Sequence, residues 1–252
     1  MSTYDEVPME ASQRRLIICT QNLRDLSKQF KLLPNLHTSG IAVVNINNVI
    51  KNTKGVLLLP DLIGNDCIVV QNPYDTRSYE LIENAHETFA LHKSLLISNV
   101  CQFLGASEYK VESIEEEKSE NKTGVSGNVK GPIGSVDGQL RHQLVNAVKK
   151  GVKQECLFEG HSPDIQSAAS FLDANNLLNE KPLTMLLTAL SNRNNKMKSF
   201  NLETNLLREV NQTLQATASL NLTSYATKIK GELEMVKTYN FNLSHKFCIL
   251  FP

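Results

Sequence analysis

Hydrophobic and polar residues alternate along residues 239–251, which form the most regular pattern in the chain. The odd-numbered positions are all apolar or aromatic apart from one histidine: Tyr239, Phe241, Leu243, His245, Phe247, Ile249 and Phe251. Because side chains on a strand point alternately to opposite faces, this period of two predicts a strand packed on one face. Similar alternation at 214–222 and 227–235 predicts two further strands. From Phe247 onward both faces are apolar, so we expect the end of the last strand to be covered on both sides.

Apolar residues recur at steps of three and four elsewhere in the chain, and this spacing predicts helices. The first helix is expected over 10–33 and the second, with the clearest stripe, over 76–104. Gly105 follows the second helix, where glycine supplies the positive φ of a C-cap. A helix pair is expected over 163–193, opened by the sequence Ser162-Pro163-Asp164, which offers a capping hydroxyl, a proline and a carboxylate.

Short apolar runs bounded by turn-forming residues predict strands at 41–46, 56–59, 67–70 and 108–113. Five glycines at steps of three or four over 124–138 favour strand and turn, and 108–158 is read as a strand and turn region. Two segments, 140–156 and 202–214, fit a helix and a strand about equally well.

The order of these elements favours an α+β fold over a doubly wound parallel sheet. We predict a long antiparallel, strongly twisted sheet with helices packed on one face, plus a smaller N-terminal α/β region. The expected division is an N-terminal helix with short strands over 1–74 and an α+β domain over 75–252, whose C-terminal strands occupy 198–251. One continuous domain is the alternative.

Composition narrows the classes of partner. The 252 residues include 26 basic and 26 acidic side chains, so no net charge draws the protein to nucleic acid, and we expect no nucleic-acid partner. Five cysteines lie singly along the chain, a pattern that suits free thiols in a reducing compartment. The polar, acidic first residues do not resemble a signal peptide, and we expect a cytoplasmic protein.

Candidate catalytic and metal motifs are weak. His86, Glu87 and His92 resemble a helical zinc motif, but the histidines are six apart instead of four and do not share a helix face. The glycine-rich 124–138 region lacks the spacing of a phosphate-binding loop. Residues 161–164 are explained by helix capping, and we expect His245 to be buried and hydrogen-bonded, with Cys248 on the opposite face of its strand. We therefore assign no catalytic, cofactor-binding or metal-binding residue, no cofactor and no small-molecule ligand.

The sequence favours a non-catalytic interaction or structural protein that acts through protein contacts, with a partner or by self-association, as part of a larger assembly. A membrane-acting, pore-forming-like β-sheet protein is the first alternative, because polar and apolar residues alternate over long segments. An enzyme with a site assembled from dispersed residues is the second. A pocket that joins His92, His142 or His161 to carboxylates would favour the enzyme.

Overall fold

The computed structural model describes residues 7–20, 40–46, 66–116, 133–152, 155–192, 196–218 and 242–252. The chain divides into two compact units. Unit 1 comprises residues 1–88 and 209–240, and unit 2 comprises residues 89–208 and 241–252. The chain thus crosses between the units three times and ends in unit 2.

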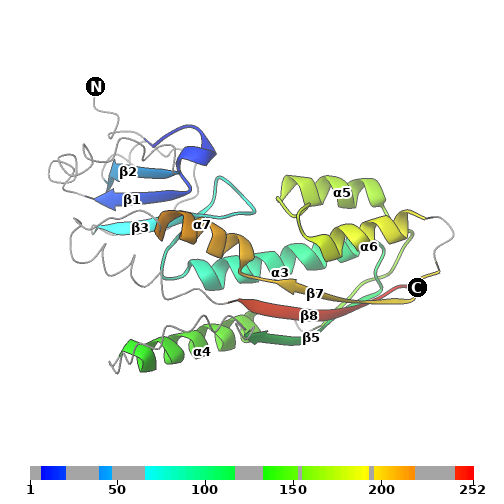
Figure 1. The fold of residues 1–252 in the computed structure, drawn as a ribbon. Coiled ribbons are helices and arrows are strands. Elements are labelled where there is room, and N and C mark those ends of the chain that lie inside the picture. Colours follow the sequence, from blue (N-terminus) through cyan, green and yellow to red (C-terminus); the bar gives the residue numbers. More distant parts are fainter. Residues whose placement is uncertain are drawn as a thin grey trace, which may run out of the picture. The chain divides into compact units, whose positions relative to one another are not determined.

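Unit 1 contains a mixed sheet with the strand order β2-β1-β3-β4 (Figure 1). Its strands are β1 (Leu16–Thr20), β2 (Ile41–Asn45), β3 (Cys67–Gln71) and β4 (Tyr79–Leu81). Strand β1 pairs parallel with β2 and antiparallel with β3. All five residues of β1 are buried, as expected for a central strand that is covered on both faces.

The sequence prediction for unit 1 was right for two strands and wrong for the first helix. Strands predicted at 41–46 and 67–70 are confirmed, whereas 56–59 lies outside the described residues. Residues 11–20 of the predicted helix form a 3-10 turn, η1 (Ala11–Gln13), and the strand β1. The continuous apolar run from Leu16 to Cys19 suits a strand buried on both faces. Its pairing with two neighbouring strands outweighs the helical spacing between Leu16 and the apolar residues that follow it in the sequence.

Helix α3 (Ala85–Phe103) is the longer part of the helix predicted over 76–104. The predicted start was wrong, because β4 occupies residues 79–81. The predicted C-cap is confirmed: Gly105 has a φ of +80°, and its N–H donates to the carbonyl of Gln102 over 2.9 Å. A Cβ at Gly105 would lie 2.1 Å from the carbonyl oxygen of His161, so glycine is required there for space as well as for φ.

Unit 2 contains an antiparallel sheet with the strand order β6-β5-β8-β7 (Figure 1). Its strands are β5 (Glu108–Glu116), β6 (Glu155–Leu157), β7 (Ser199–Asn205) and β8 (Leu243–Leu250). Strand β8 therefore lies between two strands that precede it by long stretches of sequence. A register shift between Val111 and Ser113 gives β5 an extra residue, which keeps Ile114 on the same face as Tyr109.

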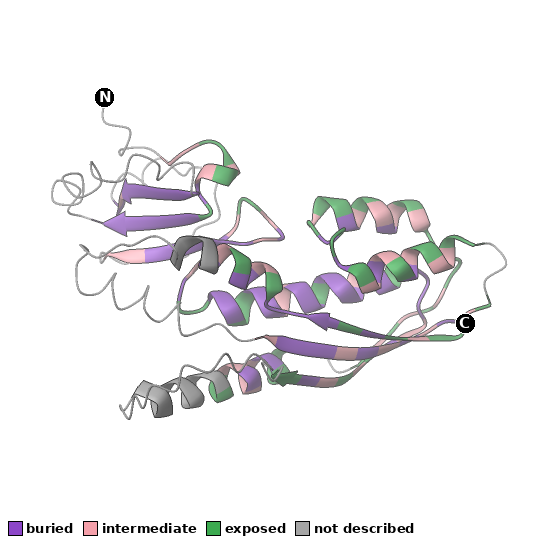
Figure 2. Cartoon of the chain, in the orientation of Figure 1, coloured by how far each residue is buried: buried purple, intermediate pink, exposed green. Residues whose placement is uncertain are grey.

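The alternation that predicted the last strand is confirmed in β8. Its odd-numbered residues are buried, and Lys246, Cys248 and Leu250 between them are half-buried (Figure 2). The second face of its end is thus covered in part. The helix pair is also confirmed, as α5 (Ile165–Ala174) and α6 (Lys181–Ser191). Together these elements confirm the α+β class and the long antiparallel sheet.

Two regions read as strand from their sequence contain helices. Helix α4 (Ile133–Gly151) includes the last glycines of the predicted strand and turn region, and residues 124–132 lie outside the described part. Helix α7 (Arg208–Ala218) replaces the start of the strand expected at 214–222, while 227–235 is not described. Val210 and Leu214 are buried four residues apart in α7, and in α4 the carbonyl of buried Val148 accepts over 2.9 Å from the N–H of Val152, just beyond the helix. The segments 140–156 and 202–214, for which the sequence did not separate helix from strand, each contain part of a helix and part of a strand.

Candidate functional site

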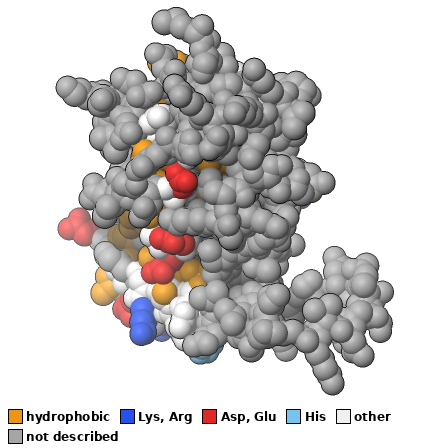
Figure 3. Space-filling model, turned by 90° about the vertical axis from the view of Figure 1, so that its left-hand side faces the viewer, with side chains coloured by type: hydrophobic (Ala, Val, Ile, Leu, Met, Phe, Trp, Pro, Cys, Tyr) orange, Lys and Arg blue, Asp and Glu red, His pale blue; other side chains and the backbone are white. Residues whose placement is uncertain are grey.

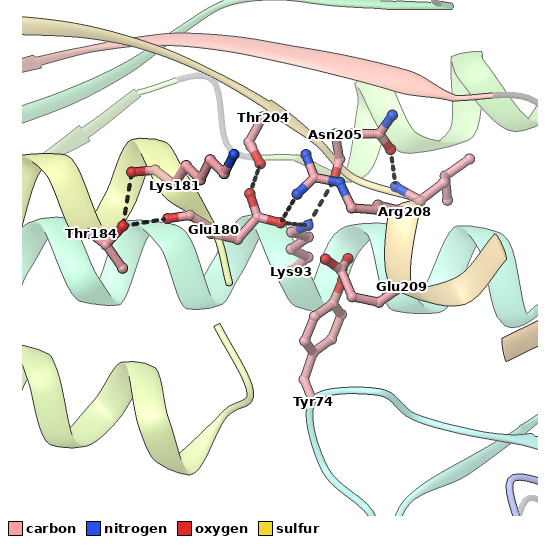
Figure 4. A network of polar contacts seen from close by, with 10 residues as sticks. Tyr74, Lys93, Glu180, Lys181, Thr184, Thr204, Asn205, Arg208 and Glu209 are labelled. Carbon is pink, nitrogen blue, oxygen red and sulfur yellow. Dashed lines mark hydrogen bonds and ion pairs between the residues drawn. The ribbon is translucent and has the colours of Figure 1, made fainter. Parts of the chain in front are cut away.

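A lysine without solvent exposure lies at the centre of unit 2 (Figure 4). Lys93, on α3, donates from Nζ to Oε1 of Glu180 and to the backbone carbonyl of Asn205, each over 2.7 Å. Glu180 is 1% exposed and directly precedes α6. Its other oxygen, Oε2, accepts a hydrogen bond of 2.5 Å from the hydroxyl of Thr204. Arg208 Nη1 lies 3.3 Å from Glu180 Oε1 and is the more exposed cation.

This network joins a helix, a helix start and the end of β7 by charge-assisted hydrogen bonds. A buried charge is tolerated only when its partners replace the lost hydration, and Lys93 and Glu180 do this for each other. Their atoms are enclosed, so the pair holds the unit together and presents no ammonium or carboxylate to a ligand. The sequence does indicate that Lys93 is buried. Lys93 lies four residues from buried Phe89 and four from buried Ile97, and so it falls within the apolar stripe of α3.

A second buried polar pair links the two longest strands of the sheet. The hydroxyl of Tyr109 on β5 lies 3.1 Å from Nε2 of His245 on β8. Burial lowers the pKa of His245 to about 4, and the nearby charge of Lys93 acts in the same direction. Burial also raises the pKa of Tyr109 well above its ordinary value. The pair is therefore uncharged at neutral pH, and the expectation of a buried, hydrogen-bonded His245 is confirmed.

A pocket of about 830 Å³ opens beside this pair, bounded by α3, the end of α4, β5 and β6. Its polar lining includes Tyr109, Ser94 and Ser98, and the Ser98 hydroxyl lies 3.7 Å from the sulfur of Cys156. Its apolar lining consists of Leu91, Leu95, Val152, Leu157 and Phe158. Leu95 is 53% exposed and Leu157 is 72% exposed, so two large aliphatic side chains beside the pocket are open to solvent.

Charges of both signs share the described surface. On the face drawn in Figure 3, acidic, basic and hydrophobic side chains are interspersed among the described residues. A smaller cavity of about 300 Å³ shares Val152 with the pocket and is bordered by Glu112, Glu115 and Lys149. The apolar pocket thus has a predominantly acidic neighbour.

No family model matches the sequence, and comparison with curated proteins and with solved structures gave no significant match. Function is therefore inferred from the chemistry of the site alone.

The histidines singled out in the sequence are dispersed in the structure. His92 lines the pocket together with Glu155, whereas His86 belongs to unit 1 and lies 3.3 Å from Oδ1 of Asn211. Burial lowers the pKa of His86 to about 4. His142 and His161 are exposed and are not among the residues that line the pocket. One carboxylate and one histidine therefore share the pocket.

The structure corrects the capping of α5. Asp164 is the N-cap, and its Oδ1 accepts from the N–H of Ser167 over 3.0 Å, so Ser162 is not the cap. Hydrogen bonds from Ser167 hold the pKa of Asp164 below its ordinary value. His161 lies beside it with Nδ1 2.7 Å from the Ser162 carbonyl oxygen. Capping thus explains the role of Asp164, with the cap two residues later than expected.

Over the described ranges, no three His, Cys, Asp or Glu side chains gather closely enough to hold a metal ion. Among the described helices, none combines the length and the apolar character needed to cross a membrane.

Proposed function

We propose that this chain is a non-catalytic binding protein that acts through contacts with a protein partner, and that the pocket between α3 and β6 receives that partner. The observation that carries the proposal is the exposure of Leu95 and Leu157 beside an apolar pocket of about 830 Å³. Exposed aliphatic side chains around a cavity form an apolar surface. Binding of another molecule removes this surface from water, and this burial favours the complex.

The partner that fits this surface is an amphipathic segment with aliphatic or aromatic anchors on one face and basic residues beside them. The apolar lining of the pocket suits the anchors, as in recognition of a helix by a hydrophobic groove. The basic residues would lie near Glu112 and Glu115, which border the adjoining cavity. A second copy of this chain that carries such a segment would satisfy the same chemistry.

The buried polar pair beside the pocket is unsuited to catalysis, although His92 and Glu155, which line the pocket, are the combination expected of an enzyme with a dispersed site. An efficient general base has a pKa near the working pH and can reach the substrate. His245 has a pKa of about 4, is fully buried, and is bonded to Tyr109. The Cys156 sulfur lies 3.7 Å from the Ser98 hydroxyl, which is not a base that would activate a thiol.

A cytoplasmic location is part of the proposal. All five cysteines are free thiols in the structure, and unpaired cysteines are typical of compartments that keep thiols reduced.

Peptides selected for binding to the native protein test the proposal. We expect the variant Leu95→Ser/Leu157→Ser to bind them at least tenfold more weakly, since burial of each leucine contributes about 1.5–3 kcal/mol. The matched control is Met185→Ser, because Met185 is 64% exposed on α6 and does not line the pocket. Circular dichroism and the urea midpoint verify that both variants remain folded.

Two results would overturn this function. The first is that selected peptides bind the pocket variant and the native protein equally well. The second is that selection enriches no peptide while a small organic probe binds the pocket, which would identify a small-molecule site.

A further inference from the structure

Two cysteines of unit 1 face each other across neighbouring strands. The antiparallel register of β1 and β3 places Cys19 directly opposite Cys67. Cys19 is fully buried in a cluster of core side chains, and Cys67 is half-buried and packs against that cluster. Both sulfurs therefore point to the same side of the sheet.

The hydrogen-bond pattern fixes the spacing of this pair. The N–H of Gln71 donates to the carbonyl of Arg15 over 2.8 Å, which makes Arg15 and Gln71 a hydrogen-bonded pair of the ladder. Hydrogen-bonded pairs recur at every second residue, so Cys19 and Cys67, two such steps away, are also of this kind. Such pairs have Cα atoms about 5.5 Å apart. Disulfides span Cα separations of about 4.4–6.8 Å, so the backbone can accept the bond.

We propose that Cys19 and Cys67 form an oxidisable thiol pair that hydrogen peroxide converts to an intramolecular disulfide. The Cys67 thiolate attacks one peroxide oxygen, the O–O bond breaks, and Cys67 becomes a sulfenic acid while hydroxide leaves. The sulfur of Cys19 then attacks the sulfur of Cys67. Its proton combines with the departing hydroxide to form water, and the S–S bond closes. Two electrons pass from the two sulfurs to the peroxide.

The burial of the two sulfurs assigns their roles. Cys67 is the more exposed residue of the two, so we assign it as the one that meets the peroxide first. The hydrogen bond with Cys67 and the burial of Cys19 hold the pKa of Cys19 far above its ordinary value. Cys19 is therefore not the thiol that is oxidised first, and as the resolving thiol it loses its proton to the departing hydroxide while the S–S bond forms.

The resulting bond is suited to reversal. Cβ atoms of directly opposed residues are about 4.5–5.5 Å apart, whereas a disulfide prefers about 3.8 Å, so the strands must approach each other slightly. A strained disulfide is reduced more readily, and disulfides in reducing compartments are typically transient and redox-sensing. While it lasts, the cross-link closes a long loop and restricts the unfolded chain.

Peptide mapping of the folded, full-length protein tests the pair. We expect peroxide to join the tryptic peptides 16–24 and 55–77, with the loss of about two mass units, and dithiothreitol to separate them. The oxidised protein should unfold at a temperature higher by about 5 °C. Cys67→Ser should abolish both effects. Cys248→Ser is the matched control, because Cys248 is also half-buried but lies opposite Lys110 and Asn201 instead of a thiol.

A second variant tests the pair if Cys67→Ser fails to fold. In Cys19→Ala, peroxide should leave a sulfenic acid on Cys67 that dimedone labels, and in the native protein this label should be weak. The proposal is overturned if peroxide gives no cross-link between the two peptides in the native protein. It is also overturned if the cross-link forms only after unfolding in urea, or if Cys67 proceeds to sulfinic acid with Cys19 present.

Discussion

The hydroxyl of Tyr109 and Nε2 of His245 lie 3.1 Å apart although 136 residues separate them in the sequence. This bond crosses from β5 to β8 in the interior of unit 2, and within the described residues Nδ1 of His245 has no hydrogen-bond partner. His245 therefore depends strongly on Tyr109.

Substitution of Tyr109 by phenylalanine should destabilise the protein by about 1–3 kcal/mol, the cost of leaving a buried polar group without its partner. The urea dependence of unfolding measures this change. In Tyr109→Phe/His245→Leu, which removes both polar groups, part of the loss should be recovered. A change below about 0.5 kcal/mol in the single variant would contradict the importance of this bond.

Acidification should weaken both units, because His86 and His245 have folded-state pKa values of about 4 against about 6.5 in the unfolded chain. Between these values the unfolded chain binds more protons, so the free energy of unfolding falls as the pH falls from about 6.5 to 4. Each histidine contributes on the order of 2–3 kcal/mol to this loss. Urea titrations at pH 7, 6 and 5 measure it.

Glutamine variants separate the two histidines. His86→Gln should flatten the pH dependence of unit 1, and His245→Gln should flatten that of unit 2. An unchanged pH profile in both variants would show that other groups cause the acid sensitivity.

Removal of the buried ammonium in Lys93→Met should cost about 3–5 kcal/mol, because Glu180 is left as a buried carboxylate without its closest cation. Arg208→Ala removes the more exposed cation and should cost less than about 1 kcal/mol. In Lys93→Met/Glu180→Leu much of the lost free energy of unfolding should be recovered, since no uncompensated charge remains. Equal stability of Lys93→Met and the native protein would refute this account.

Replacement of Gly105 by alanine should destabilise the end of α3 by more than about 1–2 kcal/mol. The φ of +80° is unfavourable for alanine, and the added Cβ would collide with the backbone of His161. Gly151→Ala provides the comparison, because its Cβ would meet the side chain of Leu91, which can move. We expect the urea midpoint to fall further for Gly105→Ala; the reverse order would be evidence against backbone strain at this position.

Deletion of residues 246–252 should make the protein insoluble or abolish cooperative unfolding. The deletion removes the buried side chains of Phe247 and Ile249 and exposes the edges of β5 and β7. Deletion of the exposed Pro252 alone is the control and should leave the protein soluble. Sedimentation of the cell extract and a thermal scan distinguish the two, and a soluble truncation with a sharp transition would disprove the prediction.

The sequence predicted those elements whose burial has a simple period. In β8 one face is buried, so alternation was visible, and in α3 a wide apolar stripe and Gly105 marked the helix. It failed at β1, where burial on both faces removes the period that separates a strand from a helix. It also failed at the start of α4, where the glycines of 124–138 suggested strand and turn, and over 140–156 it left helix and strand open.

The candidate site was harder to predict because its parts are distant in sequence. Lys93 and Glu180 are 87 residues apart, and no local sequence motif around either residue predicts that they pair. The pocket likewise depends on how α3 and β6 pack, which no local pattern encodes. His92, noted for a motif that it does not complete, turned out to line the pocket for an unrelated reason.

The position of β8 between β5 and β7 constrains how the protein is made. At about 5–20 residues per second, a ribosome needs roughly ten seconds to travel from Tyr109 to His245. Once β6 has also been made, β5 has one sheet neighbour, and its other edge waits for a strand that has not been synthesised. Unit 2 therefore completes its sheet late, and a nascent chain with an open edge is a natural client for chaperones.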